Sequence, residues 1–125
     1  MLAERDAAAT IAVKDLDRAK KFYEGSLGLK PSGGQDSEVR VYQSGNSKIV
    51  VYKSQYAGTN QANAVTWGVG DDLDGIVQTL KAKGVVFEHY DLPGLARKGD
   101  VHVAGTFKAA WFKDPDGNIL HINSG

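Results

Sequence analysis

The chain of 125 residues contains no cysteine. Disulfide frameworks, zinc–thiolate sites, iron–sulfur clusters and thiol nucleophiles are therefore excluded. The absence of disulfides fits a reducing compartment, and we expect a cytoplasmic protein. Long apolar runs are also missing, because runs such as Ile49–Tyr52 fall far short of the roughly 20 residues that a spanning helix needs. The N-terminal run Met1–Asp6 carries charges where a signal peptide would be apolar, so we expect no membrane segment.

The sequence has no surplus of either charge, because 15 Lys and Arg residues balance 15 Asp and Glu residues. A nucleic-acid-binding domain of this size normally carries a basic surplus, so we expect no nucleic-acid partner. Weak electrostatic repulsion between copies favours self-association. The motifs Gly-x-Ser-x-Gly, Walker A and Gly-x-Gly-x-x-Gly are absent too, which removes the best-known signatures of hydrolases and nucleotide-binding enzymes.

What the chain does contain is an internal repeat. The tripeptide Asp-Leu-Asp begins at Asp15 and again at Asp72, 57 residues later. Glycines that follow helical patterns stand at Gly28 and Gly84, 56 residues apart. Two copies of this length nearly fill the chain, and each is too small to bury a good core alone. The sequence therefore predicts two modules that share one core.

Module 1 covers about residues 7–56, and module 2 covers about residues 62–125. Each has an alternating segment typical of a strand, then a helical pattern, then further strand-like runs. These later runs lie near residues 30–32, 38–44 and 48–54 in module 1, and at residues 85–90, 101–104, 109–113 and 119–123 in module 2. Residues 91–108 have little regular pattern, and within them Gly94–Gly105 are expected to include a mobile loop with its exposed tip at Arg97–Asp100. The sequence thus predicts an α+β fold of two βαβββ modules.

Both predicted helices have recognisable ends. We expect them near residues 15–27 and 72–83, where apolar residues recur at helical spacing. An aspartate stands at each start, Asp15 in module 1 and Asp71 or Asp72 in module 2. Its carboxylate can accept the free N–H groups of the first turn, so we expect an N-cap at both helices.

Two runs resemble a known family. Leu16–Glu24 followed by Leu27–Leu29 resembles the first helix of the vicinal oxygen chelate superfamily, which includes glyoxalase I, extradiol dioxygenases and the bleomycin and fosfomycin resistance proteins. Phe112–Leu120, with its turn Asp114–Asn118, resembles the closing hairpin of that family. The resemblance implies a mixed sheet curled around a shared cavity, with helices outside. It also implies a homodimer, and a cavity that holds a metal in the enzymes and an apolar ligand in some binding proteins.

The resemblance also implies where a metal would bind. The family's enzymes hold a divalent ion through His, Glu or Gln side chains on the first and last strand of each module. The first-strand places are Ala8 in module 1 and Ala64 or Val65 in module 2, and none of these can bind metal. The last-strand places are Val51 and His121. Because a catalytic metal typically takes three protein ligands, we expect no cofactor, and a divalent metal would need a non-standard set that includes His121.

Alternation along the strands assigns further residues to the cavity. If His121 points inward, Trp111 on the preceding strand does too, because its neighbour Phe112 matches the core aromatic of the family. Val51 is expected to face inward in module 1, whereas the sequence leaves the faces of Tyr42 and His102 open. The candidate ligand-binding residues are therefore His121, Trp111, His102, Tyr42 and Val51.

An aromatic wall with imidazoles suits a flat, largely apolar molecule that carries a polar group. The sequence therefore favours a protein that binds a small organic molecule, in the manner of resistance or sequestration proteins, without the usual metal site. The alternative is a metal-dependent lyase, isomerase or dioxygenase that uses His121. A third interpretation is a partner-binding subunit without a ligand, in which Trp111 and His121 fill a small closed core.

Overall fold

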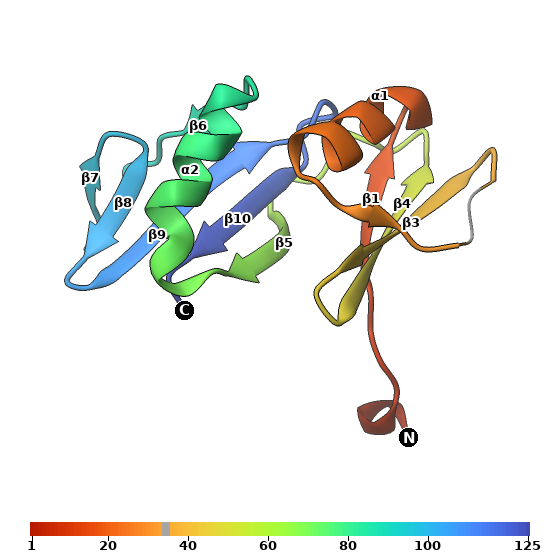
Figure 1. Cartoon of the computed structure of the whole chain (residues 1–125), viewed down its shortest axis with the longest axis horizontal. Coiled ribbons are helices and arrows are strands. Elements are labelled where there is room, and N and C mark those ends of the chain that lie inside the picture. Colours follow the sequence, from red (N-terminus) through yellow and green to blue (C-terminus); the bar gives the residue numbers. More distant parts are fainter. Residues whose placement is uncertain (34–35) are drawn as a thin grey trace.

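The computed structural model describes residues 1–33 and 36–125. A 3₁₀ turn, η1 (Leu2–Glu4), precedes the two modules, which follow one another along the chain (Figure 1). Module 1 consists of β1 (Ala9–Val13), α1 (Leu16–Lys20), its π-helical continuation η2 (Lys21–Ser26), β2 (Lys30–Pro31), β3 (Val39–Ser44) and β4 (Ser47–Lys53). Module 2 consists of β5 (Asn63–Gly68), the 3₁₀ turn η3 (Gly70–Asp72), α2 (Leu73–Ala82), β6 (Phe87–Glu88), β7 (Ala96–Lys98), β8 (Val101–Ala104), β9 (Phe107–Lys113) and β10 (Ile119–Asn123).

Each module has its own sheet. The strand order is β1-β4-β3-β2 in module 1 and β5-β10-β9-β8-β7 in module 2, with β6 pairing β9 as well. The first strand of each module runs parallel to the last, and the other neighbouring strands of the described sheets pair antiparallel. In the part of the chain that is described, the two sheets stay separate and do not close into a barrel. The predicted α+β architecture is confirmed.

The extra strand of module 2 lies in the segment whose pattern is irregular. There β7 and β8 form a hairpin, and β8 pairs with the first half of β9 while β6 pairs with its second half. The loop expected within Gly94–Gly105 is therefore partly a hairpin, with its turn at Gly99 and Asp100. Glycine suits this turn because its φ is +64°.

The two helices begin in different ways. Asp15 has an extended backbone, and its carboxylate accepts hydrogen bonds from the N–H groups of Asp17 and Arg18 at 2.9 and 3.2 Å. Asp72 precedes α2 with a helical backbone, and its side chain makes no capping bond. The expected cap at the second helix is wrong, because the turn η3 runs directly into α2. No helix within the described residues is long and apolar enough to cross a membrane.

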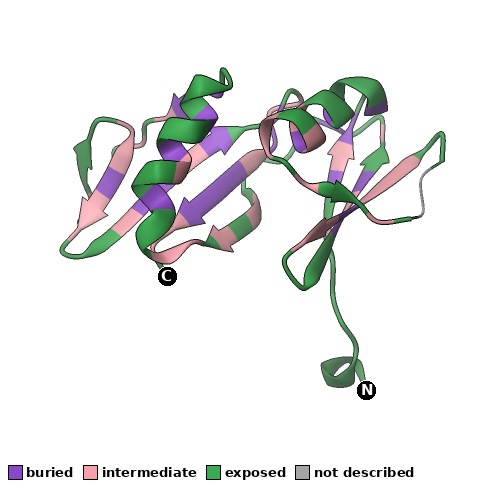
Figure 2. Ribbon diagram, viewed as in Figure 1, coloured by how far each residue is buried: buried purple, intermediate pink, exposed green. Residues whose placement is uncertain are grey.

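One core joins the modules. Both helices lie against their sheets on the same side of the molecule, where the buried positions face inward (Figure 2). Buried side chains from both modules belong to one cluster, including Val13 and Tyr23 from module 1 and Val77 and Phe112 from module 2. The Phe22 ring lies 6.5 Å from that of Phe112, across the junction. Neither module buries its helix alone, as the small size of each repeat predicts.

The turn between β9 and β10 also connects the modules. Asp114 is only 5% exposed, and its Oδ2 accepts hydrogen bonds from the Tyr23 hydroxyl at 2.6 Å and from Asn118 Nδ2 at 2.8 Å. Asn118 Nδ2 also donates to the carbonyl of Ala12 on β1, at 2.8 Å. The turn that carries the family resemblance therefore attaches the last hairpin of module 2 to the helix and first strand of module 1.

Candidate functional site

Trp111 and His121 share the face of the module 2 sheet that α2 leaves uncovered. We call this the helix-free face. Leu120 and Phe112 point to the core, and the alternate residues point away from it. The register places His121 opposite Trp111 on β9 and opposite Thr66 on β5. Trp111 and His121 therefore lie together, on the face that the hairpin pattern predicts.

Four rings form a cluster on this face, which we call the Trp111 cluster: Tyr90, His102, Trp111 and His121. The rings of Trp111 and His121 stack with centroids 4.5 Å apart and an interplanar angle of 26°. His102 meets the Trp111 ring edge-on at 4.8 Å, and Tyr90 meets it edge-on at 5.4 Å. The four rings come from β8, β9, β10 and the residues after β6, so the cluster forms only when the sheet does.

His121 is held as a neutral imidazole. Its Nδ1 lies 3.1 Å from the carbonyl oxygen of Ala110, which can only accept, so Nδ1 carries the proton. Its Nε2 then accepts from Asn123 Nδ2 at 3.3 Å. Burial lowers the pKa of His121 below its usual 6.5, against the opposing effect of the bond to Ala110. The ring therefore presents a hydrogen-bond acceptor next to an amide donor.

His102 is fully buried, with one ring nitrogen lacking a partner within the described residues. Its Nε2 faces the backbone of Tyr90, 2.9 Å from the nitrogen and 3.1 Å from the oxygen. Its Nδ1 is buried and makes no hydrogen bond there. Unpaired buried polar groups are unusual and often mark a binding or catalytic position. The Trp111 cluster therefore contains one imidazole nitrogen without a partner, and because this atom is buried, a ligand reaches it only if the neighbouring rings move.

Tyr42 and Val51, the other two candidate residues, lie on the helix-covered face of the module 1 sheet. Tyr42 is fully buried, stacks on Tyr23 at 6.2 Å, and donates its hydroxyl to Glu24 Oε2 at 2.9 Å. Val51 is also fully buried and belongs to the core under the helix. The inward face expected for Val51 is therefore wrong, and neither residue reaches the Trp111 cluster's face.

The register explains this error. In module 2, Thr66 on the first strand lies opposite His121 on the last. The matching pair in module 1 is Thr10 and Val50. Val50, not Val51, is therefore the counterpart of His121. A one-residue slip in a strand moves every side chain to the other face, so the misplaced alignment reversed the assignment for β4.

Two further residues complete the site. Asn123 stands two places after His121 on β10, so strand alternation already indicates its face. Tyr90 ends the strand-like run of residues 85–90, and its contact with Trp111 depends on the pairing of β6 with β9, which no local pattern predicts. The site is thus built around a pair that sequence reasoning finds, and it is extended by a residue that sequence reasoning cannot place.

Comparison with known proteins identifies the family. Residues 7–122 match the family model of the Glyoxalase/Bleomycin resistance protein/Dioxygenase superfamily. The chain belongs to this superfamily. The family predicted from the two sequence motifs is therefore confirmed. No curated protein matches the chain.

Solved structures share the fold of this superfamily member at low sequence identity. An integron cassette protein from the mobile metagenome of the Halifax Harbour sewage outfall is 16% identical, with a TM-score of 0.72 over 98% of this chain and 99% of that one. Lactoylglutathione lyase from Agrobacterium tumefaciens is 16% identical, with a TM-score of 0.70 over 96% and 92%. The fosfomycin resistance protein FosX from Listeria monocytogenes, complexed with Mn(II) and sulfate, is 14% identical, with a TM-score of 0.71 over 98% and 90%.

The residues present do not fit the superfamily's usual metal site. Within residues 1–33 and 36–125, no three His, Cys, Asp or Glu side chains gather closely enough to hold an ion. The counterpart of His121 in module 1 is Val50, which has no ligand atom. His121 itself already uses Nδ1 for Ala110 and Nε2 for Asn123. A metal ion here would replace the Asn123 bond and find one imidazole where three ligands are typical.

Proposed function

We propose that the Trp111 cluster binds a flat, largely apolar organic molecule that carries a hydroxyl group, and that it does so without a metal ion. The observation that supports this most is the stack of a neutral His121 on Trp111. Trp111 is partly exposed, and its ring provides a surface for a flat ring system, with the imidazole of His121 beside it as a polar contact. Such a protein would sequester its ligand or protect the cell from it, as resistance proteins do.

The polar atoms of the site favour a hydroxyl over other groups. His121 Nε2 accepts a hydrogen bond, and Asn123 Nδ2 next to it donates one. A hydroxyl that inserts between these two atoms, in place of the bond that joins them, can donate to the first and accept from the second, whereas a carboxylate can only accept. Because burial keeps His121 neutral, a carboxylate would find no charge partner in that ring. Phenols and naphthols therefore match the site better than aromatic acids.

We also propose that a second copy of the chain covers the open side of the sheets. Phe107 lies on the helix-free face and is 42% exposed, and Tyr52 on the corresponding face of module 1 is 38% exposed. Zero net charge gives no repulsion between copies. Sedimentation at tens of micromolar, an order-of-magnitude working range, should show a species of twice 13.4 kDa. A species of 13.4 kDa alone would contradict this part of the proposal.

Calorimetric titration tests the binding proposal directly. Protein dialysed against EDTA is titrated with 2-naphthol and with 2-methoxynaphthalene, which keeps the rings but has no hydroxyl proton. We expect the naphthol to bind more tightly than the methoxynaphthalene. His121→Phe should remove this difference by weakening naphthol binding by roughly 1–3 kcal/mol, the cost of losing the polar contact. Tyr42→Phe is the matched control, because Tyr42 lies on the helix-covered face and should leave both affinities unchanged. Equal binding of the two compounds to the wild type would refute the role of His121.

The alternative function is a metal-dependent lyase, isomerase or dioxygenase that uses His121. It is favoured by the Mn(II) complex of the structurally similar FosX. This alternative predicts one equivalent of manganese, iron, nickel or zinc after dialysis, and its loss in His121→Ala. Our proposal predicts well under one equivalent in both proteins. Elemental analysis separates the two functions.

A further inference from the structure

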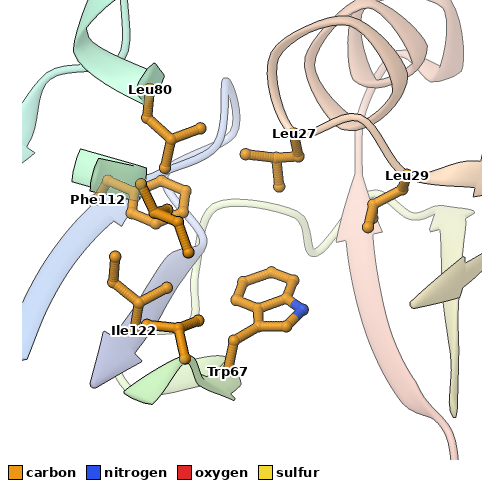
Figure 3. Close-up of a pocket in the computed structure, with 8 residues that line it drawn as sticks. Leu27, Leu29, Trp67, Leu80, Phe112 and Ile122 are labelled. Carbon is orange, nitrogen blue, oxygen red and sulfur yellow. The ribbon is translucent and has the colours of Figure 1, made fainter. Parts of the chain in front are cut away.

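A second hollow lies on the helix-covered side of the sheets, where the modules meet. Its volume is about 150 Å³, and every side chain that lines it is apolar. Figure 3 shows its walls, with Leu27 and Leu29 of module 1 on one side, Leu80, Phe112 and Ile122 of module 2 on the other, and Trp67 of β5 between them. Most of these side chains are partly exposed, so solvent reaches the hollow.

The polar atom of the Trp67 side chain, Nε1, points away from the hollow. Its Nε1 donates to Ser44 Oγ of module 1 at 2.9 Å. The indole nitrogen is therefore satisfied across the junction, and the carbon part of the ring is left facing Leu27 and Phe112 (Figure 3). A water molecule needs two to four polar partners, and the side chains that line this hollow offer it almost none. Water is accordingly a poor occupant of the hollow.

The hollow is separate from the Trp111 cluster. Phe112 follows Trp111 on β9, and Ile122 follows His121 on β10, so the members of each pair point to opposite faces of the sheet. Phe112 and Ile122 line the hollow, whereas Trp111 and His121 stack on the helix-free face. A molecule in the hollow would therefore lie across the sheet from one bound at the cluster.

We propose that this hollow is a second binding site, specific for a small uncharged aromatic molecule of one ring. The volume limits the size of the ligand, because about 150 Å³ is the volume of an apolar cavity that takes up benzene. The lining decides the polarity, since any hydrogen-bonding group on the ligand would lose its water and gain no partner. The Trp67 and Phe112 rings favour an aromatic occupant, which they can meet edge-to-face.

Toluene is the probe, and the two indole N–H resonances of the ¹⁵N spectrum are the readout. The chain has two tryptophans, and Trp67→Phe assigns the signals. We expect toluene to shift the Trp67 resonance saturably and to leave that of Trp111 in place. Movement of the Trp111 signal alone, or of both signals without saturation, would overturn the proposal. So would a Trp67 signal that ignores toluene and moves with protein concentration, because a second copy would then occupy the hollow.

Filling the hollow gives a second test. Leu29→Phe adds volume to its wall, and we expect toluene to bind at least tenfold more weakly. Leu92→Phe makes the same change at a leucine that is not part of the lining, and the affinity should match the wild type. If Leu29→Phe does not fold, Val69→Leu repeats the test at another lining residue. Wild-type affinity in a folded filled variant would refute the site, whatever the outcome of the naphthol titration at the other face.

Discussion

Replacing Asp114 by asparagine should destabilise the protein strongly, because this carboxylate receives four hydrogen bonds. Its Oδ1 accepts from the backbone N–H groups of Asp116 and Asn118, both at 2.9 Å. Its Oδ2 accepts from the hydroxyl of Tyr23 and from Asn118 Nδ2. Asparagine has almost the same shape, so the variant changes the chemistry and leaves the packing intact.

The magnitude follows from which bonds are lost. Asparagine still offers one oxygen to the two backbone N–H groups, but its amide NH₂ replaces Oδ2 and meets two donors. Each hydrogen bond to a charged group contributes about 1.5 kcal/mol or more, so we expect a loss of about 3 kcal/mol. Tyr23→Phe removes one of these bonds and should cost about 1.5 kcal/mol. A domain of this size is typically stable by about 5–15 kcal/mol, so either variant should still fold.

Urea unfolding at pH 7, followed by tryptophan fluorescence, measures these free energies. We expect Tyr23→Phe to cost much less in the Asp114→Asn background, because its partner is already lost. Tyr42→Phe is the control: its hydroxyl contacts Glu24, so its cost should be the same in both backgrounds. If Asp114→Asn lowers the free energy of unfolding by less than about 1 kcal/mol, the loss is well below that expected for two hydrogen bonds. The turn would then not join the modules as described. Equal costs of Tyr23→Phe in the two backgrounds would show the same.

Three further predictions concern pH and backbone conformation. Burial, and then the Asp114 charge, raise the pKa of the Tyr23 phenol above its usual 10.0. This group should therefore contribute its full stability below pH 10.0 and lose it as the pH rises further. Tyr23→Phe should reduce the resulting fall in Tm. Burial lowers the pKa of His121, so the unfolded state binds more protons and stability should fall as the pH drops below 6.5. Urea unfolding of His121→Gln should show an unfolding free energy that depends less steeply on pH. Gly75→Ala meets no atom within 4 Å in α2 and should stabilise by about 0.5–1 kcal/mol, whereas Gly84→Ala, at φ +89°, should destabilise by about 1 kcal/mol, both measured by urea unfolding.

The sequence predicts the parts of the fold that local signals determine. The repeat, both helices and the closing turn are confirmed, because capping, helical spacing and turn residues act within a few positions of one another. The positive φ values of Gly28 and Gly84, 73° and 89°, follow from the same reasoning. The cap at α2 could not be predicted, because two adjacent aspartates obscure where the helix begins.

The candidate site is predictable only in part. The shared face of Trp111 and His121, opposite Phe112 and Leu120, is predicted correctly because both residues can be counted outward from a well-defined turn. Val51 is misplaced because Ile49, Val50 and Val51 are consecutive β-branched residues, so alternation gives no indication of which one faces the helix. His102 lies in the predicted run 101–104, but the sequence leaves its face open, and the pairing of β8 with β9 is what places its ring beside Trp111. The hollow at Trp67 depends on contacts between modules, which no local pattern records.

The claim that the Trp111 cluster binds a hydroxyl-bearing aromatic molecule without metal can be tested by one crystal structure, grown with 2-naphthol and EDTA. We expect the rings to lie against Trp111, with the hydroxyl within hydrogen-bond distance of His121 Nε2 and Asn123 Nδ2. Naphthol bound only elsewhere, or a cluster closed off by the protein's own side chains, would contradict the account.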